Sequence, residues 1–405
     1  MLPQTNTDAF APAFGLTSQP KAIPIIISQP TSGQRHMVTD PALPMLGDAL
    51  DNQTMTQHLR PRLPMLAQAR NMSVISSQVL DHKAGKRALI RYELSTPQQS
   101  ANLVIFGKIY SQLDQLMRVD QVMEALWYDV YDTDKTCGIP QPLGVISALS
   151  MHLYRPADGD FLDTVLNGPA GARAMHGAAR WLGTLHGHAL ALSKHFDLAN
   201  ELKNLAAWTN LVGQTYPELA AQAHQLLAYL QQQAQNITLE ATTPIHKDFH
   251  YRHVLVNQPN GVGVNVIDFD EMRLGDPNFD LAHFCANLHL LAYRQQGTPH
   301  HLRWLERRFL HSYANHMGQS WSAFARSNGE RFRFFYIYSC IKIARQLCLG
   351  FGPSPAPADG ARRNQVQMIL EQGLHHSRRL NLAKPMSPSA SSAHENLNEY
   401  EQGRK

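Results

Sequence analysis

Cysteine is scarce in this 405-residue chain, which contains only Cys137, Cys285, Cys340 and Cys348. No two of them form a Cys-x-x-Cys pair, so neither a zinc cluster nor a disulfide framework is indicated. We therefore expect a reducing, cytoplasmic environment. Charge is also sparse: charged residues make up 17% of the chain, and the net charge is only +4. So small an excess argues against a dedicated nucleic-acid-binding protein.

Long hydrophobic runs are missing as well. The longest isoleucine run, Ile25-Ile26-Ile27, is far too short to cross a bilayer, and no basic segment followed by an apolar core marks an export signal. We expect no membrane partner. Internal repeats and coiled-coil heptads are absent, while 43% of the residues are apolar. Length and composition fit a globular protein with a substantial core and one or two lobes.

Composition and periodicity divide the chain into four parts. Residues 1–40 are rich in Pro, Ser, Thr and Gln and are expected to form a flexible extension, and residues 381–405 a disordered tail. Residues 41–155 carry strand-like runs and residues 156–380 carry helical spacing. In the last part, separate helices are expected at 321–327 and 330–349.

Three apolar runs predict strands in the β-rich part, at Val74–Leu80, Ala88–Leu94 and Leu103–Tyr110. The turn between the first two contains Lys83, Lys86 and Arg87, which, with the backbone amides of the turn, are candidates for covering phosphate groups. A solvated basic hairpin tip is an equally good interpretation, because the turn lacks the Gly-x-Gly-x-x-Gly pattern.

The most informative stretch begins at Thr243. Valines alternate with other residues on both sides of a Gln-Pro-Asn-Gly sequence, which predicts two strands joined by a turn. Such a hairpin returns Asp268 towards Asp248. Two carboxylates brought together with histidines nearby suit a metal site or proton-handling chemistry.

Several short motifs occur here in an order that resembles the aminoglycoside phosphotransferase and choline kinase family. His246–His253 resembles the catalytic loop His-Gly-Asp-x-His-x-x-Asn, Ile267–Asp270 resembles the metal-binding segment, and Gly275–Ala282 resembles the Gly-Asp-Pro-x-x-Asp-Leu-Ala run that follows. The resemblance implies an α+β, two-lobed protein-kinase-like fold, with a small β-rich N-terminal lobe and a larger helical C-terminal lobe. It also implies that the lobes meet near residues 154–160, where the adenine of ATP binds.

The same resemblance implies phosphoryl transfer from ATP to a hydroxyl group of a small molecule, such as a sugar, amino sugar, amino alcohol or aminoglycoside. Asp248 would be the catalytic base and Asp268 the Mg²⁺ ligand. Lys108, alone in an apolar strand, would contact the α- and β-phosphates and pair with Glu124 of the next helix. The other carboxylates of the loop region, Asp276 and Asp280, are expected to be structural.

One position departs from the family pattern. His253 stands where the family has an Asn that binds a second Mg²⁺, and magnesium prefers oxygen ligands to imidazole. His253 would then hydrogen-bond a phosphate, bind a softer metal, leave a single Mg²⁺ to support the reaction, or mark lost activity. Two further functions therefore stay open: a nucleotide-binding pseudokinase with a regulatory or scaffolding role, and a hydrolase that uses Asp248 and Asp268 on a metal-activated water.

Overall fold

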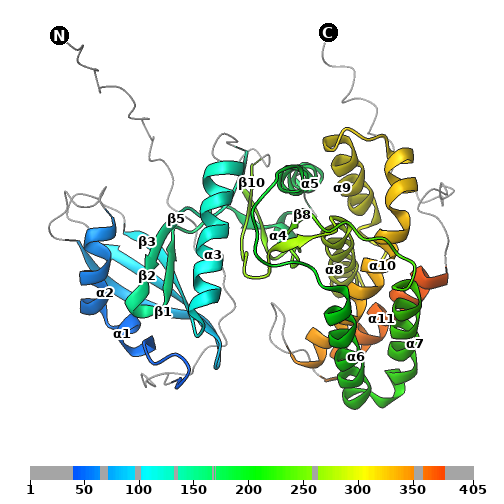
Figure 1. The fold of residues 1–405 in the computed structure, drawn as a ribbon, viewed down its shortest axis with the longest axis horizontal. Coiled ribbons are helices and arrows are strands. Elements are labelled where there is room, and N and C mark those ends of the chain that lie inside the picture. The colour runs from blue at the N-terminus through cyan, green and yellow to red at the C-terminus, as the bar shows by residue number, and fades with distance from the viewer. Residues whose placement is uncertain are drawn as a thin grey trace, which may run out of the picture.

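The computed structural model of the chain describes residues 40–63, 72–95, 102–131, 136–166, 168, 170–257, 263–350 and 359–378. The expected N-terminal extension, apart from its last residue, and the expected C-terminal tail lie outside the described residues. The described chain forms an α+β fold with two lobes, a small one built on a sheet and a larger one built mainly of helices (Figure 1).

The small lobe contains a five-stranded antiparallel sheet in the order β1-β2-β3-β6-β5. The strands are β1 (Ser73–Lys83), β2 (Arg87–Ser95), β3 (Leu103–Tyr110), β5 (Pro142–Ile146) and β6 (Met151–Tyr154). Burial alternates strictly along β2, as its sequence pattern predicts for a strand with one buried face. That face packs against α1 (Leu46–Leu50) and α2 (Asn52–Leu59) in one apolar core. Helix α3 (Leu113–Ala125) contacts β3, β5 and β6, and its buried residues join the core that continues into the large lobe.

A second sheet, in the order β4-β10-β9-β7, lies in the large lobe. Its strands are β4 (Cys137–Gly138), β7 (Asp160–Phe161), β9 (Val254–Asn257) and β10 (Gly263–Val266). The antiparallel β9–β10 pair, with Val256 opposite Val264, confirms the predicted hairpin strands, although their connection lies outside the described part of the chain. β4 comes from the residues expected to belong to the first lobe, yet it pairs with β10 in parallel. A short ladder joins β8 (Thr243–Ile245) to β11 (Arg273–Gly275).

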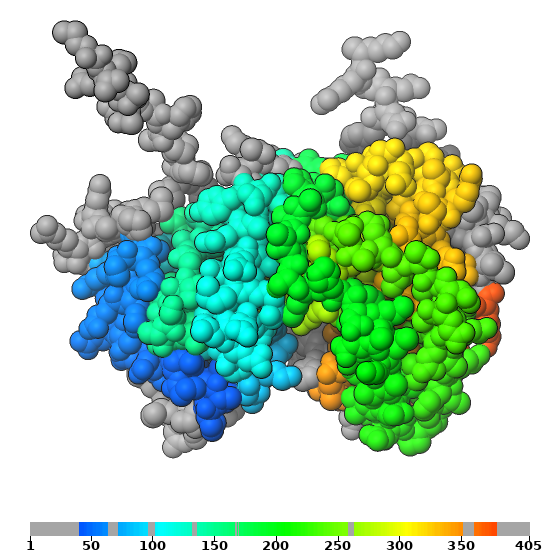
Figure 2. Space-filling model, viewed as in Figure 1, coloured from blue at the N-terminus to red at the C-terminus, as the bar shows by residue number. Residues whose placement is uncertain are grey.

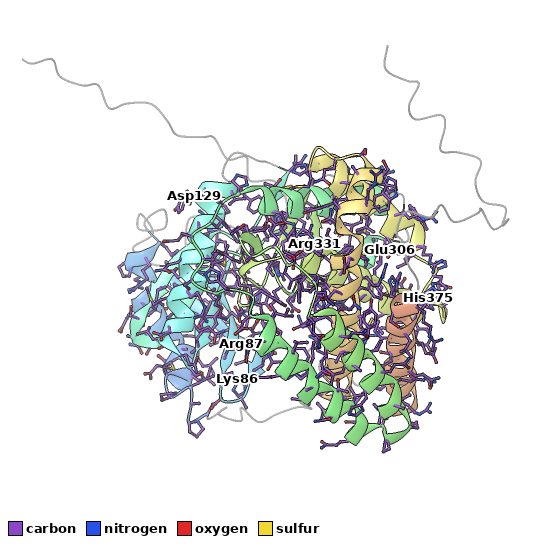
Figure 3. All side chains as sticks on the ribbon, turned by 45° about the vertical axis from the view of Figure 1, so that its right-hand side comes forward. Lys86, Arg87, Asp129, Glu306, Arg331 and His375 are labelled. Carbon is purple, nitrogen blue, oxygen red and sulfur yellow. The ribbon has the colours of Figure 1, made fainter. Side chains whose placement is uncertain are left out.

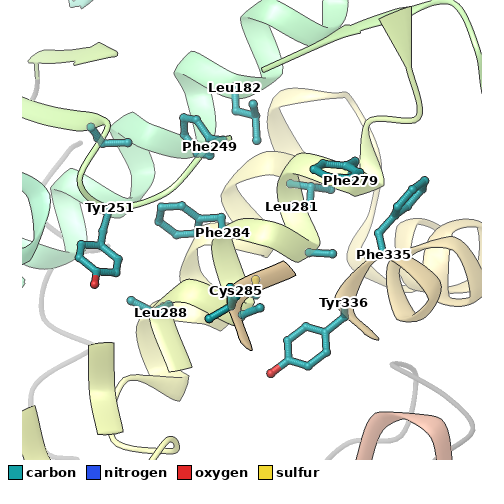
Figure 4. Packing of buried hydrophobic residues seen from close by; sticks show 14 of the residues in the cluster. Leu182, Phe249, Tyr251, Phe279, Leu281, Phe284, Cys285, Leu288, Phe335 and Tyr336 are labelled. Atoms are coloured by element: carbon teal, nitrogen blue, oxygen red, sulfur yellow. The ribbon is translucent and has the colours of Figure 1, made fainter. Parts of the chain in front are cut away.

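Helices make up the rest of the large lobe. They are α4 (Leu162–Val165), α5 (Gly171–Gly187), α6 (Leu198–Thr215), α7 (Ala220–Gln233), α8 (Asn278–Gln296), α9 (Arg303–His316), α10 (Trp321–Cys348) and α11 (Asp359–Arg378). Residues 278–292 of α8 are all buried, and the rings of Phe284 and Tyr336 lie in the same packed region (Figure 4). Among the described helices, none combines the length and the apolar character that a membrane span needs.

The two helices expected at 321–327 and 330–349 are one continuous helix, α10. The predicted break was wrong. Asn328 and Gly329 have low helix propensity, and an Asn side chain tends to end a helix when it hydrogen-bonds the nearby backbone in a non-helical conformation. Here the Asn328 amide nitrogen donates to Phe324 O at 3.1 Å and its oxygen accepts from Asn278 Nδ2 at 2.9 Å. A hollow between the small lobe, in blue and cyan, and the green helices of the large lobe is visible in Figure 2.

Candidate active site

The loop between β8 and β9 is held by a buried carboxylate. Asp280 of α8 accepts hydrogen bonds from the backbone N–H groups of His246 and Lys247, at 2.7 and 2.8 Å. His246 Nε2 lies 3.1 Å from the carbonyl oxygen of Ile267, and it must donate there because a carbonyl only accepts. Its other ring nitrogen, Nδ1, accepts from the N–H of Asp248 at 3.3 Å. His246 and Asp280 therefore fix the loop to β10 and α8.

Trp181 of α5 explains why the two carboxylates face the same space. Its buried ring stacks on Phe249, with centroids 5.8 Å apart, and on Phe269, with centroids 6.3 Å apart. These phenylalanines directly follow Asp248 and Asp268, so each apolar neighbour is packed inward while the acid before it is turned out. Asp268 has a φ of 68°, a left-handed conformation that is uncommon for a non-glycine residue and often marks functional sites.

Lys247 also has a left-handed φ, 65°. Its buried ammonium forms an ion pair with Glu201 of α6, and the same carboxylate accepts from the hydroxyl of Tyr338. Burial lowers the pKa of Lys247 to about 8, and nearby Arg273 contributes in the same direction. The family's glycine at this position is thus replaced by an anchor between the loop and α6, which motif matching did not predict.

Asp248 has two unequal oxygens. Oδ1 lies 2.7 Å from Nζ of Lys342, a residue of α10, and 3.3 Å from Nε2 of His283 on α8. Oδ2 lies 3.8 Å from both His250 Nε2 and His253 Nδ1, beyond hydrogen-bond distance. Burial by itself would raise the pKa of Asp248, but the Lys342 ammonium and the His283 hydrogen bond outweigh it and hold the pKa well below its usual range. One oxygen is therefore fixed, and the other is left for a ligand.

Neither Lys342 nor His283 was among the residues predicted from sequence. His283 is neutral at pH 7, because burial and the nearby Lys342 lower its pKa to about 4. Lys342 stands between Ile341 and Ile343, and a single lysine in an apolar run was the signal that singled out Lys108. The same criterion, applied to helices as well as strands, would have singled out Lys342, although not its contact with Asp248.

Asp268 lies where the two lobes meet. Its Oδ1 accepts from Nζ of Lys108 at 2.9 Å, and its Oδ2 lies 3.7 Å from Arg87 NH2 and 3.6 Å from His253 Nε2. Burial raises the pKa of this carboxyl, but Lys108 and Arg87 outweigh that effect and lower it strongly. Asp248, Asp268, Lys108 and His253, all predicted from sequence, are brought into one neighbourhood.

Asp270 is the neighbour that sequence reasoning left without a role. It is buried and accepts from Lys108 Nζ and from the Tyr110 hydroxyl, both at 2.8 Å. Arg87, at the start of β2, forms a further ion pair with it. Figure 3 shows Arg87 and Lys86 at the edge of the small lobe next to the large lobe. Lys86 is exposed, as is Lys83, so Arg87 is the residue of this hairpin that reaches the carboxylates.

Glu124 does not meet the expectation of a pair with Lys108. It is exposed on α3, outside the buried stripe formed by Leu116, Val119 and Met123. The carboxylate of α3 that faces the sheet is Asp120, which lies 3.3 Å from His152 Nε2 on β6. In the described structure Lys108 pairs instead with Asp268 and Asp270.

These donors can be tested against the metal that the fold implies. The carboxylate of Asp268 is an oxygen donor of the kind that Mg²⁺ takes together with nucleotide phosphates, and it fits. His253 offers only imidazole nitrogen, which is a poor match for Mg²⁺. Asp248, His250 and His253 also have donor atoms within 4.8 Å of one another.

Comparisons with known proteins agree with this architecture. The model of the phosphotransferase enzyme family matches residues 93–319, more than half of the chain. Spectinomycin phosphotransferase, solved with ADP and spectinomycin, has a TM-score of 0.51 at 12% identity, covering 80% of this chain and 98% of that one. An aminoglycoside phosphotransferase-like protein from Ralstonia eutropha JMP134 has a TM-score of 0.51 at 16% identity, with the same coverage. Curated protein sequences gave no match. The chain therefore belongs to the phosphotransferase enzyme family, and it is a small-molecule phosphotransferase with the two-lobed protein-kinase-like fold.

Proposed function

We propose that this protein transfers the γ-phosphoryl group of ATP to a hydroxyl group of a small molecule, in the cytoplasm, with Asp248 as the base. The observation that carries the proposal is that the two carboxylates have different surroundings. Asp248 is fixed through one oxygen by Lys342 and His283 and keeps the other free, whereas Asp268 lies among the cations Lys108 and Arg87. This is the arrangement expected when one acid handles a proton and the other serves the phosphate side.

The acceptor hydroxyl would donate its hydrogen bond to Asp248 Oδ2. The low pKa of this carboxyl keeps it ionised at neutral pH, so it is able to orient the hydroxyl from the start. A weak base suffices, because phosphoryl transfer passes through a loose transition state and depends mainly on positioning and charge stabilisation. Proton transfer to Asp248 would follow as the new O–P bond forms.

Lys108 would contact the phosphates, since it is a buried cation that faces the space between the lobes. Arg87 would share this role, in place of the exposed Lys83 and Lys86. Asp268 would hold Mg²⁺, which when bound neutralises phosphate charge. Support for ATP as the donor comes from spectinomycin phosphotransferase, which has the same fold and was solved with ADP.

Calorimetric titration of ATP into the purified chain, with and without Mg²⁺, tests the proposal. We expect Mg²⁺-dependent binding that is lost in Asp268→Asn and kept in Asp248→Asn. Asp248→Asn should then lower phosphate transfer at least about a hundredfold, the usual contribution of general acid–base catalysis. Wild-type turnover in Asp248→Asn, or ATP binding that is indifferent to both ion and Asp268, would refute the assignment.

A nucleotide-binding pseudokinase is the second candidate, and His253 is the observation that favours it. The imidazole lies beside Asp268, where an oxygen ligand is expected. Restoring the family residue with His253→Asn separates the two functions. A measurable rate that changes in the variant supports an enzyme, whereas ATP binding with no turnover in either protein supports the pseudokinase.

A further inference from the structure

Three histidines, His250, His253 and His283, lie within 4 Å of Asp248 or Asp268. Hydrogen bonds decide which ring nitrogens of His250 and His253 are available to a ligand. His250 Nδ1 accepts from the N–H of Arg252 at 3.1 Å. A neutral imidazole has one N–H and one lone pair, so the proton of His250 is on Nε2 and faces Asp248. His250 has no lone pair left for a metal.

His253 has the opposite arrangement. Its Nδ1 lies 2.8 Å from the backbone carbonyl oxygen of Asp248, and a carbonyl only accepts, so Nδ1 carries the proton. In the neutral ring, Nε2 then presents its lone pair towards Asp268, whose Oδ2 is 3.6 Å away. A nitrogen lone pair and a carboxylate oxygen repel each other at this distance unless a proton or a metal ion lies between them.

Ring geometry excludes a site shared by His250 and His253. The two rings stack with centroids 3.8 Å apart and planes inclined by only 28°. Imidazole lone pairs lie in the ring plane, so the lone pairs of nearly parallel rings do not converge on one ion. The cluster of Asp248, His250 and His253 is therefore held together by hydrogen bonds and stacking rather than by a shared metal.

We propose that His253 Nε2 and Asp268 Oδ2 together bind a first-row transition-metal ion in preference to Mg²⁺. Donor–metal distances of about 2.1 Å allow two donors up to about 4.2 Å apart to share an ion, and the observed separation of 3.6 Å satisfies this limit. Second-shell support is present, because the Nδ1–H bond to Asp248 O fixes the ring and its tautomer. One imidazole in an otherwise oxygen-rich set shifts the preference towards ions such as Co²⁺. The inference rests on the proposed function, since nucleotide phosphates would complete the ligand set.

The test uses Co²⁺ as the probe and a non-hydrolysable ATP analogue with a β,γ-imido bridge. Affinities of Co²⁺ and Mg²⁺ for the analogue complex are measured by calorimetry for wild type, His253→Asn and His250→Gln. We expect the Co²⁺ preference over Mg²⁺ to fall at least about tenfold in His253→Asn, as for loss of a well-oriented contact at a metal site. The visible spectrum of bound Co²⁺ should also change in His253→Asn. His250→Gln is the matched control and should keep both the preference and the spectrum.

The same ion ratio and the same Co²⁺ spectrum in all three proteins would overturn the metal inference while leaving nucleotide binding intact. His253 would then bridge to Asp268 through a proton. A changed ratio in His250→Gln but not in His253→Asn would also overturn it, because the assigned tautomers would be reversed. If the analogue binds neither wild type nor His253→Asn, with Co²⁺ or with Mg²⁺, the proposed function is refuted, and the metal inference with it.

Discussion

Replacing Lys342 by methionine should convert Asp248 from a permanently ionised carboxylate into one that titrates near neutral pH. Methionine keeps much of the aliphatic length but removes the ammonium that lies 2.7 Å from Oδ1. At that separation and an effective dielectric constant of about 20, the attraction is about 6 kcal/mol. Asp248 would remain partly buried without its main counter-charge, and desolvation by itself raises the pKa of a carboxyl.

Two measurements follow from this change. Truncating one partner of a buried ion pair costs about 3–5 kcal/mol, so we expect a loss of that order in the free energy of unfolding by urea at pH 7. The acidic limb of the rate–pH profile should move upward by more than one pH unit, measured as basal ATP hydrolysis if no acceptor is in hand. Lys342→Arg keeps the charge and should retain most of the wild-type unfolding free energy and the wild-type position of the acidic limb.

The sign of the pH effect distinguishes this explanation from simple loss of packing. In wild type the Asp248 pKa is depressed, so its contribution to stability is present above the unfolded pKa and is lost as pH falls through the folded value. In Lys342→Met the Asp248 pKa is raised, and its contribution is lost as pH rises instead. The Lys342→Met/Asp248→Asn double variant removes both charges and should recover stability. A Lys342→Met profile that coincides with wild type, in a folded protein, would refute the reasoning.

Four other substitutions probe the surrounding contacts. Lys108→Met should weaken ATP binding strongly in a calorimetric titration. Glu124→Ala should leave the affinity for ATP within twofold, because Glu124 is exposed on α3. Equal losses of affinity in the two variants would instead support a functional Lys108–Glu124 pair. Arg87→Met leaves Asp270 with Lys108 and Tyr110 only, so we expect about 1–3 kcal/mol lower unfolding free energy; an unchanged urea midpoint would contradict this. Asp280→Asn removes the negative charge and leaves one side-chain oxygen where two loop N–H groups each have an oxygen of their own, so we expect about 2–3 kcal/mol lower unfolding free energy and slower phosphate transfer. Full activity would show that the loop does not depend on Asp280.

Sequence pattern was sufficient to predict elements whose contacts are between residues close in the chain. Strict alternation in β2 and in the β9–β10 pair placed the strands, and the hairpin placed Asp268 beside the loop of Asp248. Both depend on side chains a few residues apart, whose directions are set by the strand period of two. The resemblance of the loop motifs supplied what periodicity does not, namely that these strands belong to a two-lobed fold.

Contacts between distant segments were not accessible in the same way. Lys342 is 94 positions from Asp248 in the chain, and nothing local in α10 shows which turn of that helix reaches the loop. The error at Glu124 has a related cause. Asp120 and Glu124 are one helical turn apart on the same side of α3 and differ in position along the helix axis. Only the packing of α3 against the sheet decides which of them reaches a side chain of that sheet.

The ion pairs between the lobes involve the same cations that the proposed nucleotide site would use. Lys108 and Arg87 come from the small lobe, and both are paired with Asp268 and Asp270 of the large lobe. Phosphates entering this space would compete with two carboxylates for those cations, unless a metal ion neutralises Asp268 at the same time. An ion held by Asp268 and His253 would release Lys108 and Arg87 to the phosphates while still joining the lobes. On this argument the metal is required for nucleotide affinity as well as for transfer, and removing it should weaken ATP binding more in wild type than in a variant that lacks the Asp268 carboxylate.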